Sequence, residues 1–149
     1  MKTGMIVRSV PLVLFNGDGK VFCLRELVSK PDIGKIVGSK DYSVPWETQE
    51  VGEEDGDTLR RLLREEVDAT GTIVISEPFF LGKVPVYETT ASAYAARFMS
   101  GPQDLCGTHA GSEFEPLGWR SLEFLLSRCR DGIVEVVGRY QSKLAELKK

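Results

Sequence analysis

The sequence predicts a mixed α/β (α+β) sandwich that forms a single domain over residues 1–149. Three observations support this class. Segments of β type stand on both sides of one strongly amphipathic helical segment, two more helical segments close the chain, and 149 residues suffice for one hydrophobic core. A sheet formed by such strands has to bury its faces against those helices.

The chain begins with a predicted β-hairpin. Ile6–Phe15 is rich in Val, Leu and Ile, which favours a buried strand, and Val21–Leu27 returns as the second arm. The residues Asn16-Gly17-Asp18-Gly19 form the turn, because Asn-Gly and Asp-Gly pairs tolerate a positive φ. Lys30–Tyr42 is predicted to be a loop, and Tyr42–Trp46 a short strand.

The segment Asp57–Val67 is the clearest predicted helix. Its apolar residues recur at helical spacing with Arg and Glu between them, at Leu59, Leu62, Leu63 and Val67. Asp57 is expected to cap the first turn and Gly71 to end the helix. The leucines are therefore expected in the core.

The second half of the chain alternates strands and loops before it ends in helices. Thr72–Ser76 has the β-branched content of a strand, and Lys83–Met99 predicts two more, of which Ala91–Phe98 is the second. Gly101–Gly118 is expected to be a polar loop. The last two segments are predicted helices, Ser121–Arg130 and Val134–Leu147, with Ser121 as the cap of the first.

The charge and the cysteines restrict the function classes. A net charge of −3 argues against general nucleic-acid binding, which needs a basic surface. A small phosphorylated ligand stays compatible, because a bound divalent cation reverses the local field. The three cysteines show no paired spacing, which indicates free thiols in a reducing compartment, and Cys23, within a strand, is expected to be buried and inert. With no apolar run near ~18 residues and no signal peptide, a cytoplasmic protein is expected, with no membrane contact.

The segment Pro45–Glu66 resembles the Nudix box, whose pattern is G-x5-E-x7-R-E-U-x-E-E-x-G-U with U aliphatic, and it is most similar to the MutT branch. The matches in a gap-free register are Pro45, Glu50, Gly52, Glu53, Arg61, Leu63, Glu65 and Glu66. The E-x7-R spacing between Glu53 and Arg61 is kept, as is the glutamate pair four residues beyond the arginine.

The motif is also degenerate. Trp46 and Glu47 stand where the family has two glycines, Leu62 replaces the glutamate after the arginine, and Asp68 stands at the terminal glycine. A register shifted to begin at Arg64-Glu65 would place Gly71 on that glycine. It would also put Glu66 on the aliphatic position and break the upstream spacing, so the gap-free register is preferred.

The resemblance extends beyond the box. The hairpin Arg8–Arg25 is similar to the opening hairpin of the family, and Glu113–Leu122 is similar to its acidic loop before a tryptophan and the last helix. The resemblance implies a Nudix-type α/β/α sandwich with a mixed sheet and a central motif helix.

The resemblance also implies a chemistry, which is a metal-dependent pyrophosphatase acting on a nucleoside diphosphate linked to another moiety. Glu65 and Glu66 would be the main ligands of Mg²⁺ or Mn²⁺, and Glu53 and Glu50 would support them, because hard cations prefer oxygen ligands. Arg61 would orient the carboxylates. Positions 62, 65 and 66 share one helix face.

Several other residues are left with two readings. Glu113 is either the general base or an exposed loop carboxylate. Arg8 and Arg25 are either substrate-binding or surface residues, and His109 is either a surface residue or a phosphate contact. Trp46 and Trp119 are expected to pack in the core.

Two other functions remain open. A catalytically inactive nucleotide-binding or sensor domain is the alternative, because the motif has lost glycines and a carboxylate; a protein-interaction module has the least support. The expected partner is a small phosphorylated nucleotide-type ligand, and a homodimer is left open.

Overall fold

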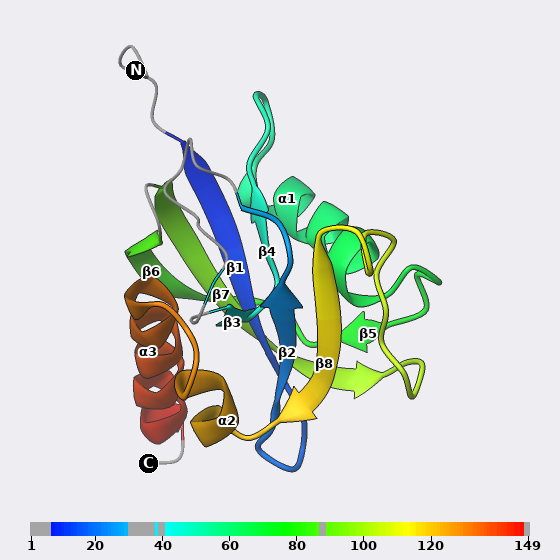
Figure 1. Ribbon diagram of the computed structural model, residues 1–149. Helices are drawn as coiled ribbons and strands as arrows, with labels where there is room; N and C mark the ends of the chain where they lie inside the picture. The colour runs from blue at the N-terminus through cyan, green and yellow to red at the C-terminus, as the bar shows by residue number, and fades with distance from the viewer. Residues whose placement is uncertain (1–6, 30–37, 39–40, 87–88, 148–149) are drawn as a thin grey trace.

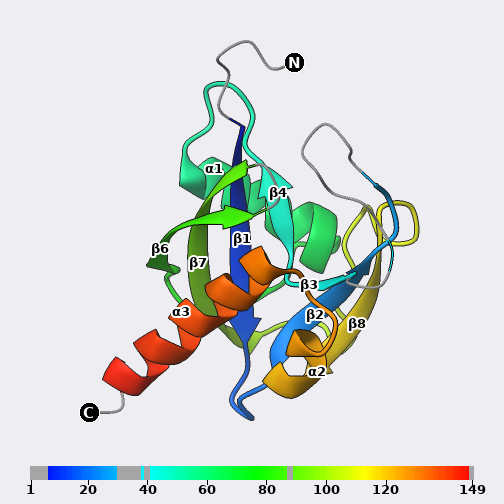
Figure 2. The same ribbon diagram turned by 60° about the vertical axis from the view of Figure 1, so that its left-hand side comes forward.

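A mixed β-sheet forms the middle layer of the fold, with helices on both of its faces (Figures 1 and 2). The computed structural model describes residues 7–29, 38, 41–86 and 89–147. The strands are β1 (Arg8–Phe15), β2 (Val21–Glu26), β3 (Tyr42–Ser43), β4 (Trp46–Thr48), β5 (Val74–Ile75), β6 (Phe79–Val86), β7 (Thr89–Ser100) and β8 (Phe114–Arg120). The helices are α1 (Asp55–Leu62), the π-helical turn η2 (Leu63–Val67), α2 (Leu122–Leu126) and α3 (Asp131–Leu147).

Strand β1 lies in the centre of the sheet. It runs parallel to β7 and antiparallel to β2 and β4. Outside these, β2 pairs with β3 and β8, and β7 pairs with β5 and β6, all antiparallel. The sheet is therefore mixed, and the predicted α/β/α sandwich is confirmed.

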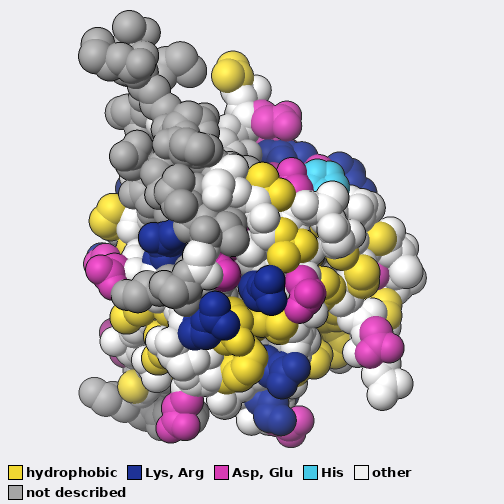
Figure 3. Space-filling model, in the orientation of Figure 1, with side chains coloured by type: hydrophobic (Ala, Val, Ile, Leu, Met, Phe, Trp, Pro, Cys, Tyr) yellow, Lys and Arg dark blue, Asp and Glu magenta, His cyan; other side chains and the backbone are white. Residues whose placement is uncertain are grey.

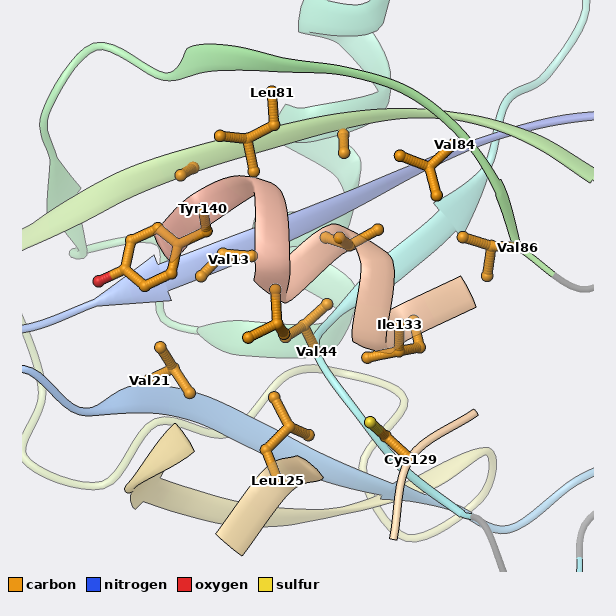
Figure 4. Close-up of a cluster of buried hydrophobic side chains, with 14 of the residues drawn as sticks. Val13, Val21, Val44, Leu81, Val84, Val86, Leu125, Cys129, Ile133 and Tyr140 are labelled. Atoms are coloured by element: carbon orange, nitrogen blue, oxygen red, sulfur yellow. The ribbon is translucent and has the colours of Figure 1, made fainter. Parts of the chain in front are cut away.

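The two faces of the sheet bury two separate cores, because successive side chains of a strand point to opposite faces. On one face, Val13 of β1 packs with Ile133 and Tyr140 of α3 (Figure 4). On the other, Leu12 and Leu14 pack against α1 and η2. The helical spacing that predicted Leu59 and Leu62 as core residues is confirmed, since Leu62 is fully buried.

Several sequence-based boundaries need correction. Strand β1 begins at Arg8, and the predicted start at Ile6 lies outside the described residues, as does most of the predicted loop Lys30–Tyr42. Tyr42–Trp46 is not one strand, because Val44 and Pro45 separate β3 from β4. Strand β6 begins four residues before the predicted Lys83.

The first turn of α1 is capped differently from the prediction. The helix begins at Asp55, with Glu54 as the N-cap residue. Asp57 is the third helical residue, and its carboxylate accepts a hydrogen bond from the Glu54 N–H at 3.0 Å. Asp57 therefore completes a capping box instead of being the cap itself. The predicted Ser121 cap of α2 is confirmed, since its hydroxyl accepts from Phe124 N–H.

The predicted loop Gly101–Gly118 is wrong in its last five residues, because β8 begins at Phe114. This strand pairs with β2, and the register shifts where Cys23 faces Gly118 and Leu24 faces Pro116. Leu117 is the extra residue of a bulge, and Gly118 has a φ of 75°. The glycine that indicated a loop supplies the positive φ of this bulge.

The cysteines agree with their prediction. All three are free thiols, and Cys23 is fully buried. Burial raises the pKa of Cys23 to about 12, so its thiol is inert at neutral pH. Within the described part of the chain, no helix is both long and apolar enough to cross a membrane.

Candidate functional site

A pocket of about 380 Å³ opens where β2, β4, η2 and the segment before β8 meet. Its lining residues are Glu26, Trp46, Glu47, Thr48, Glu50, Arg61, Glu65, Glu66, His109, Glu113 and Phe114. Six of these are glutamates, and Arg61 and His109 are the two basic side chains among the described residues that line the pocket. Figure 3 shows His109, the one histidine of the chain, at the surface beside charged side chains. Such a pocket attracts cations.

Arg61 of α1 organises the carboxylates on one side of the pocket. Its Nη2 and Nε donate to the two oxygens of Glu53 at 2.8 and 3.1 Å, and its Nη1 forms an ion pair with Glu47. Nη2 also donates to the Thr48 carbonyl at 2.7 Å, which connects α1 to β4. The guanidinium thus holds two carboxylates and a strand in fixed positions.

The Arg61–Glu53 pair fixes the ionisation of both groups. The hydrogen bonds from Arg61, followed by the one from Glu50 N–H, lower the pKa of Glu53 to about 2. The hydrogen bonds to Glu53, assisted by the charge of Glu47, raise the pKa of Arg61 although burial opposes this. Glu53 is therefore ionised at neutral pH and pairs with the charged Arg61.

Glu65 and Glu66 of η2 present adjacent carboxylates to the pocket. Glu66 is only 5% exposed, and its Oε1 accepts from Trp46 N–H at 3.0 Å. Burial, and then contact with Glu47, raises the pKa of Glu66 well above its ordinary value. Burial and Glu47 also raise the pKa of Glu65. These carboxylates are crowded together, and a divalent cation between them would relieve the repulsion.

His109 completes the pocket from the segment before β8. Its Nδ1 lies 3.2 Å from Glu113 Oε2 and 3.6 Å from Glu65 Oε1. Ligand atoms of Glu47, Glu65 and His109 all lie within 4.8 Å of one another, a grouping that suits a metal ion. Residues from three separate segments therefore converge on one point.

No family model and no curated protein matches this chain. Solved structures do match it. A MutT protein from Methanosarcina mazei Go1 is 18% identical with a TM-score of 0.65, and the match covers 96% of this chain and 98% of that one. The chain has the Nudix fold.

Two further solved structures share this fold. A C. elegans Ap4A hydrolase, solved as a binary complex, is 16% identical with a TM-score of 0.61, and the match covers 95% of this chain and 99% of the hydrolase. The NUDIX domain of Shewanella oneidensis NrtR, complexed with ADP ribose, is 15% identical with a TM-score of 0.61. The match covers 94% of this chain and 89% of that domain.

Glu113 and the glutamates that match the Nudix-box pattern occupy distinct places in this fold. Glu65 and Glu66 line the pocket, and Glu113 lines it with a 42% exposed side chain. Glu50 also lines it but is 69% exposed and lies 3.9 Å from Arg61 Nε. Both oxygens of Glu53 face Arg61. The predicted metal and base roles of these residues stay predictions.

The two arginines predicted to contact substrate are not among the described residues that line the pocket. Arg8 is exposed at the start of β1. Arg25 neighbours Glu26, which does line the pocket, so strand alternation directs Arg25 to the opposite face of the sheet. A substrate role for either residue stays a prediction without support from this geometry.

Sequence reasoning missed Glu47 as a site residue and weighed His109 mainly as a surface one. Glu47 entered only as a departure from a glycine, yet its side chain is 11% exposed and faces Arg61. The signal in the sequence was a charged residue two positions after Pro45, where the Nudix-box pattern has a glycine. Trp46, the other departure, is buried as predicted, and its ring N–H donates to Glu26 at 2.6 Å.

Asp68, which replaces the last glycine of the box, does not disturb the chain. Its φ is −145°, so this position needs no glycine. Its N–H donates to the Leu63 carbonyl at 2.7 Å, which closes the π-helical turn. Its carboxylate accepts from the backbone N–H groups of Thr70, Thr72 and Ile73, and Gly71 supplies the positive φ of the turn.

Gly107 brings the His109 segment against η2. Thr108 N–H and His109 N–H donate to the carbonyls of Arg64 and Glu65 at 3.1 and 2.9 Å. A Cβ on Gly107 would lie 2.1 Å from the Glu65 carbonyl oxygen, closer than any real contact. Only glycine therefore permits this approach of two backbones.

We expect Gly107→Ala to lower the free energy of unfolding by about 1–3 kcal/mol, the usual cost of forcing a methyl group into packed structure. Gly138→Ala is the matched control. It lies in α3, and a Cβ added there would meet open space, so alanine should stabilise the protein by up to about 1 kcal/mol. Urea unfolding measures both, and equal stability of Gly107→Ala and the wild type would contradict the close approach.

The lowered pKa of Glu53 predicts that the free energy of unfolding decreases at acid pH. Glu53 takes up a proton near pH 4.5 in the unfolded chain but only near 2 in the folded protein. The contribution of Glu53 to the free energy of unfolding is thus complete above about pH 4.5 and is lost as the pH falls towards 2. Glu53→Gln should be less stable than the wild type near neutral pH, and the difference should shrink at about pH 3.

Denaturant unfolding at three pH values measures this difference. Glu50→Gln is the control, since that side chain is mostly exposed and its loss should change stability by at most about 0.5 kcal/mol. A Glu53→Gln deficit of constant size from neutral to acid pH would contradict the prediction.

Proposed function

We propose that the protein is a metal-dependent hydrolase that cleaves the phosphoric anhydride of a nucleoside diphosphate linked to another moiety. The observation that carries the proposal is the convergence of Glu65, Glu66, Glu47 and His109 on one acidic pocket. Phosphates would be repelled by six glutamates unless cations accompany them. The pocket therefore fits a phosphate substrate only together with metal.

The donor set fits Mg²⁺ or Mn²⁺. Glu65 and Glu66 would hold the metal, with Glu47 and His109 beside them, because oxygen ligands suit these hard cations. When bound, the metal neutralises charge on the phosphates and lowers the pKa of the attacking water. Glu66 is oriented for this by Trp46 N–H, which holds one of its oxygens.

Other side chains of the pocket would position and activate the reactants. Arg61 keeps Glu47 in place through their ion pair and keeps Glu53 ionised. Glu113 is our candidate for the base that takes the proton from the attacking water, since its carboxylate lines the pocket and is partly open to solvent. The neighbouring His109 holds that carboxylate at 3.2 Å.

The fold neighbours support a nucleotide-type ligand. One is named an Ap4A hydrolase, and another was solved with ADP ribose. Both compounds contain an adenosine joined through a phosphoric anhydride to a second group. We therefore expect a small nucleotide derivative as the substrate. We also expect the protein to act in the cytoplasm.

The test is an assay of nucleotide release from ADP-ribose and diadenosine tetraphosphate, with Mg²⁺, Mn²⁺ or a chelator present. We expect turnover that the chelator stops and that Glu65→Gln reduces at least about 100-fold. Glu115→Gln, an exposed carboxylate of β8 that does not line the pocket, is the matched control and should keep full activity.

The alternative, a catalytically inactive domain that binds a nucleotide, rests on Leu62, which leaves one expected carboxylate absent from the pocket. The same substrates distinguish the two functions. Binding of ADP-ribose in calorimetry without any release of product would support the alternative. Absence of both binding and release for every compound would refute both functions.

A further inference from the structure

We propose that Glu47, Glu65 and His109 together form a cation site that prefers Mn²⁺ to Mg²⁺, with Glu47 as an added ligand at a box position that has no side chain in the family pattern. The proposal deepens the proposed function, on which it rests for the role of the metal. It concerns binding by this chain's own residues, which can be measured without any substrate.

The carboxylate expected after Arg61 cannot take part in such a site. Position 62 holds a fully buried leucine that packs with Leu12 and Phe22 in the core beneath α1. Glu65 and Glu66 therefore lack their expected partner one turn earlier on the helix. Any third strong ligand has to come from another segment of the chain.

Glu47 reaches the same point from β4. Arg61 Nη1 binds one oxygen of its carboxylate, and a carboxylate has a second oxygen for another partner. The ligand atom of Glu47 lies within 4.8 Å of those of Glu65 and His109. Ligands on opposite sides of a hexacoordinate cation are ~4.2 Å apart and adjacent ones ~3 Å, given metal–oxygen distances of ~2.1 Å. To bind one ion, the ligand atoms would have to approach one another by at most about 0.6 Å for opposite positions and about 1.8 Å for adjacent ones.

The three ligands come from elements that hold them firmly. Glu47 is fixed by Arg61, and the η2 backbone at Glu65 accepts a hydrogen bond from His109 N–H at 2.9 Å. Glu113 Oε2 lies 3.2 Å from His109 Nδ1, the same ring nitrogen that faces Glu65 Oε1 at 3.6 Å, so the Glu113 carboxylate also lies beside this point. The geometry is thus largely formed before a cation enters.

The imidazole determines which cation the site prefers. Mg²⁺ binds oxygen almost exclusively and keeps several waters, whereas first-row transition metals accept an imidazole nitrogen. Mn²⁺ accepts both carboxylate and imidazole ligands. A site with two carboxylates and His109 should therefore bind Mn²⁺ more tightly than Mg²⁺, and the excess should depend on His109.

The experiment titrates the full chain with Mn²⁺ and follows free Mn²⁺ by electron paramagnetic resonance, with Mg²⁺ as competitor and no substrate present. We expect Glu47→Gln to weaken Mn²⁺ binding at least about 10-fold. His109→Asn should reduce the preference for Mn²⁺ over Mg²⁺ by about 10-fold and leave Mg²⁺ affinity nearly unchanged. Glu115→Gln should bind as the wild type does.

Two results would overturn the proposal. One is wild-type Mn²⁺ affinity in a folded Glu47→Gln protein, and the other is an equal loss of both metals in His109→Asn. Melting temperatures in chelator check the folding of each variant. If Glu47→Gln does not fold without its Arg61 contact, His109→Asn still decides, because that side chain is 39% exposed and its replacement should be tolerated.

The proposal and the proposed function can fail separately. Selective Mn²⁺ binding through Glu47 and His109, without hydrolysis of any nucleotide derivative, would refute the hydrolase and leave the cation site standing. Metal-dependent hydrolysis by a Glu47→Gln protein with unchanged metal affinity would keep the hydrolase and refute the role of Glu47.

Discussion

Leu62→Glu is expected to destabilise the protein strongly and to leave its metal affinity no higher, although it restores the consensus Nudix-box residue. The sequence alone suggests the opposite, that a glutamate here would complete the site and create activity. Leu62 is fully buried within the core formed by Val10, Leu12, Leu14 and Phe22. A carboxylate buried there without a partner costs several kcal/mol.

We expect a loss of about 3–5 kcal/mol in the free energy of unfolding near pH 7, a large part of the ~5–15 kcal/mol that holds a domain folded. Burial would raise the pKa of the new carboxyl group above its unfolded value of ~4.3. The protonated form is the cheaper one to bury, so the deficit should grow as the pH rises above ~4.3 and be smaller near pH 4.

Leu62→Met is the matched control, since it conserves volume and apolar character and should cost less than about 1.5 kcal/mol. Urea unfolding and Mn²⁺ titration of both variants make the measurement. A Leu62→Glu protein with wild-type stability and tighter metal binding would show that position 62 reaches the pocket after all.

The parts of the fold that could be predicted from sequence are those set by local patterns. The apolar run of β1, the turn at Asn16-Gly17 and the leucine spacing of α1 all act over a few residues, and each element lies where it was expected within a few positions. The Glu53–Arg61 spacing also depends on one helix and its cap, and the two side chains do meet.

The features that could not be predicted depend on contacts between distant segments. Strand β8 contains Glu115, Pro116 and Gly118, which give no local strand signal, and it forms because β2 offers an antiparallel edge. The π-helical turn requires the hydrogen bond from Asp68 to Leu63. Neither can be deduced from propensity alone.

The site shows the same division. Glu65 and Glu66 follow from the motif, whereas Glu47 enters because β4 pairs with β1 and so carries its side chain to Arg61, 14 residues away along the chain. His109 enters because Gly107 allows its segment to lie against η2. A one-dimensional motif records the candidate ligands on the helix and cannot record side chains brought in from the sheet and the loop.

Arg61→Ala is expected to lower the free energy of unfolding by about 3 kcal/mol near neutral pH and to abolish the proposed hydrolysis. The side chain is 15% exposed and pairs with Glu47 and Glu53, so its removal leaves these carboxylates without their counter-charge. It also breaks the hydrogen bond to the Thr48 carbonyl that ties α1 to β4. Arg61→Lys should recover only part of the stability, because an ammonium cannot make the paired hydrogen bonds of a guanidinium.

The adjacent Arg60 provides the matched control. Its side chain is 74% exposed and pairs with Asp57 of the same helix, so Arg60→Ala should cost about 0.5 kcal/mol or less. Denaturant unfolding compares the two variants in the same buffer. Equal stability of the two variants would mean that the carboxylates find other partners, and that Arg61 does not organise the site.

Arg61 also screens Glu47 from Glu65, so its loss should increase the repulsion between carboxylates in the pocket. Mn²⁺ should therefore raise the melting temperature of any folded Arg61→Ala protein more than that of Arg60→Ala.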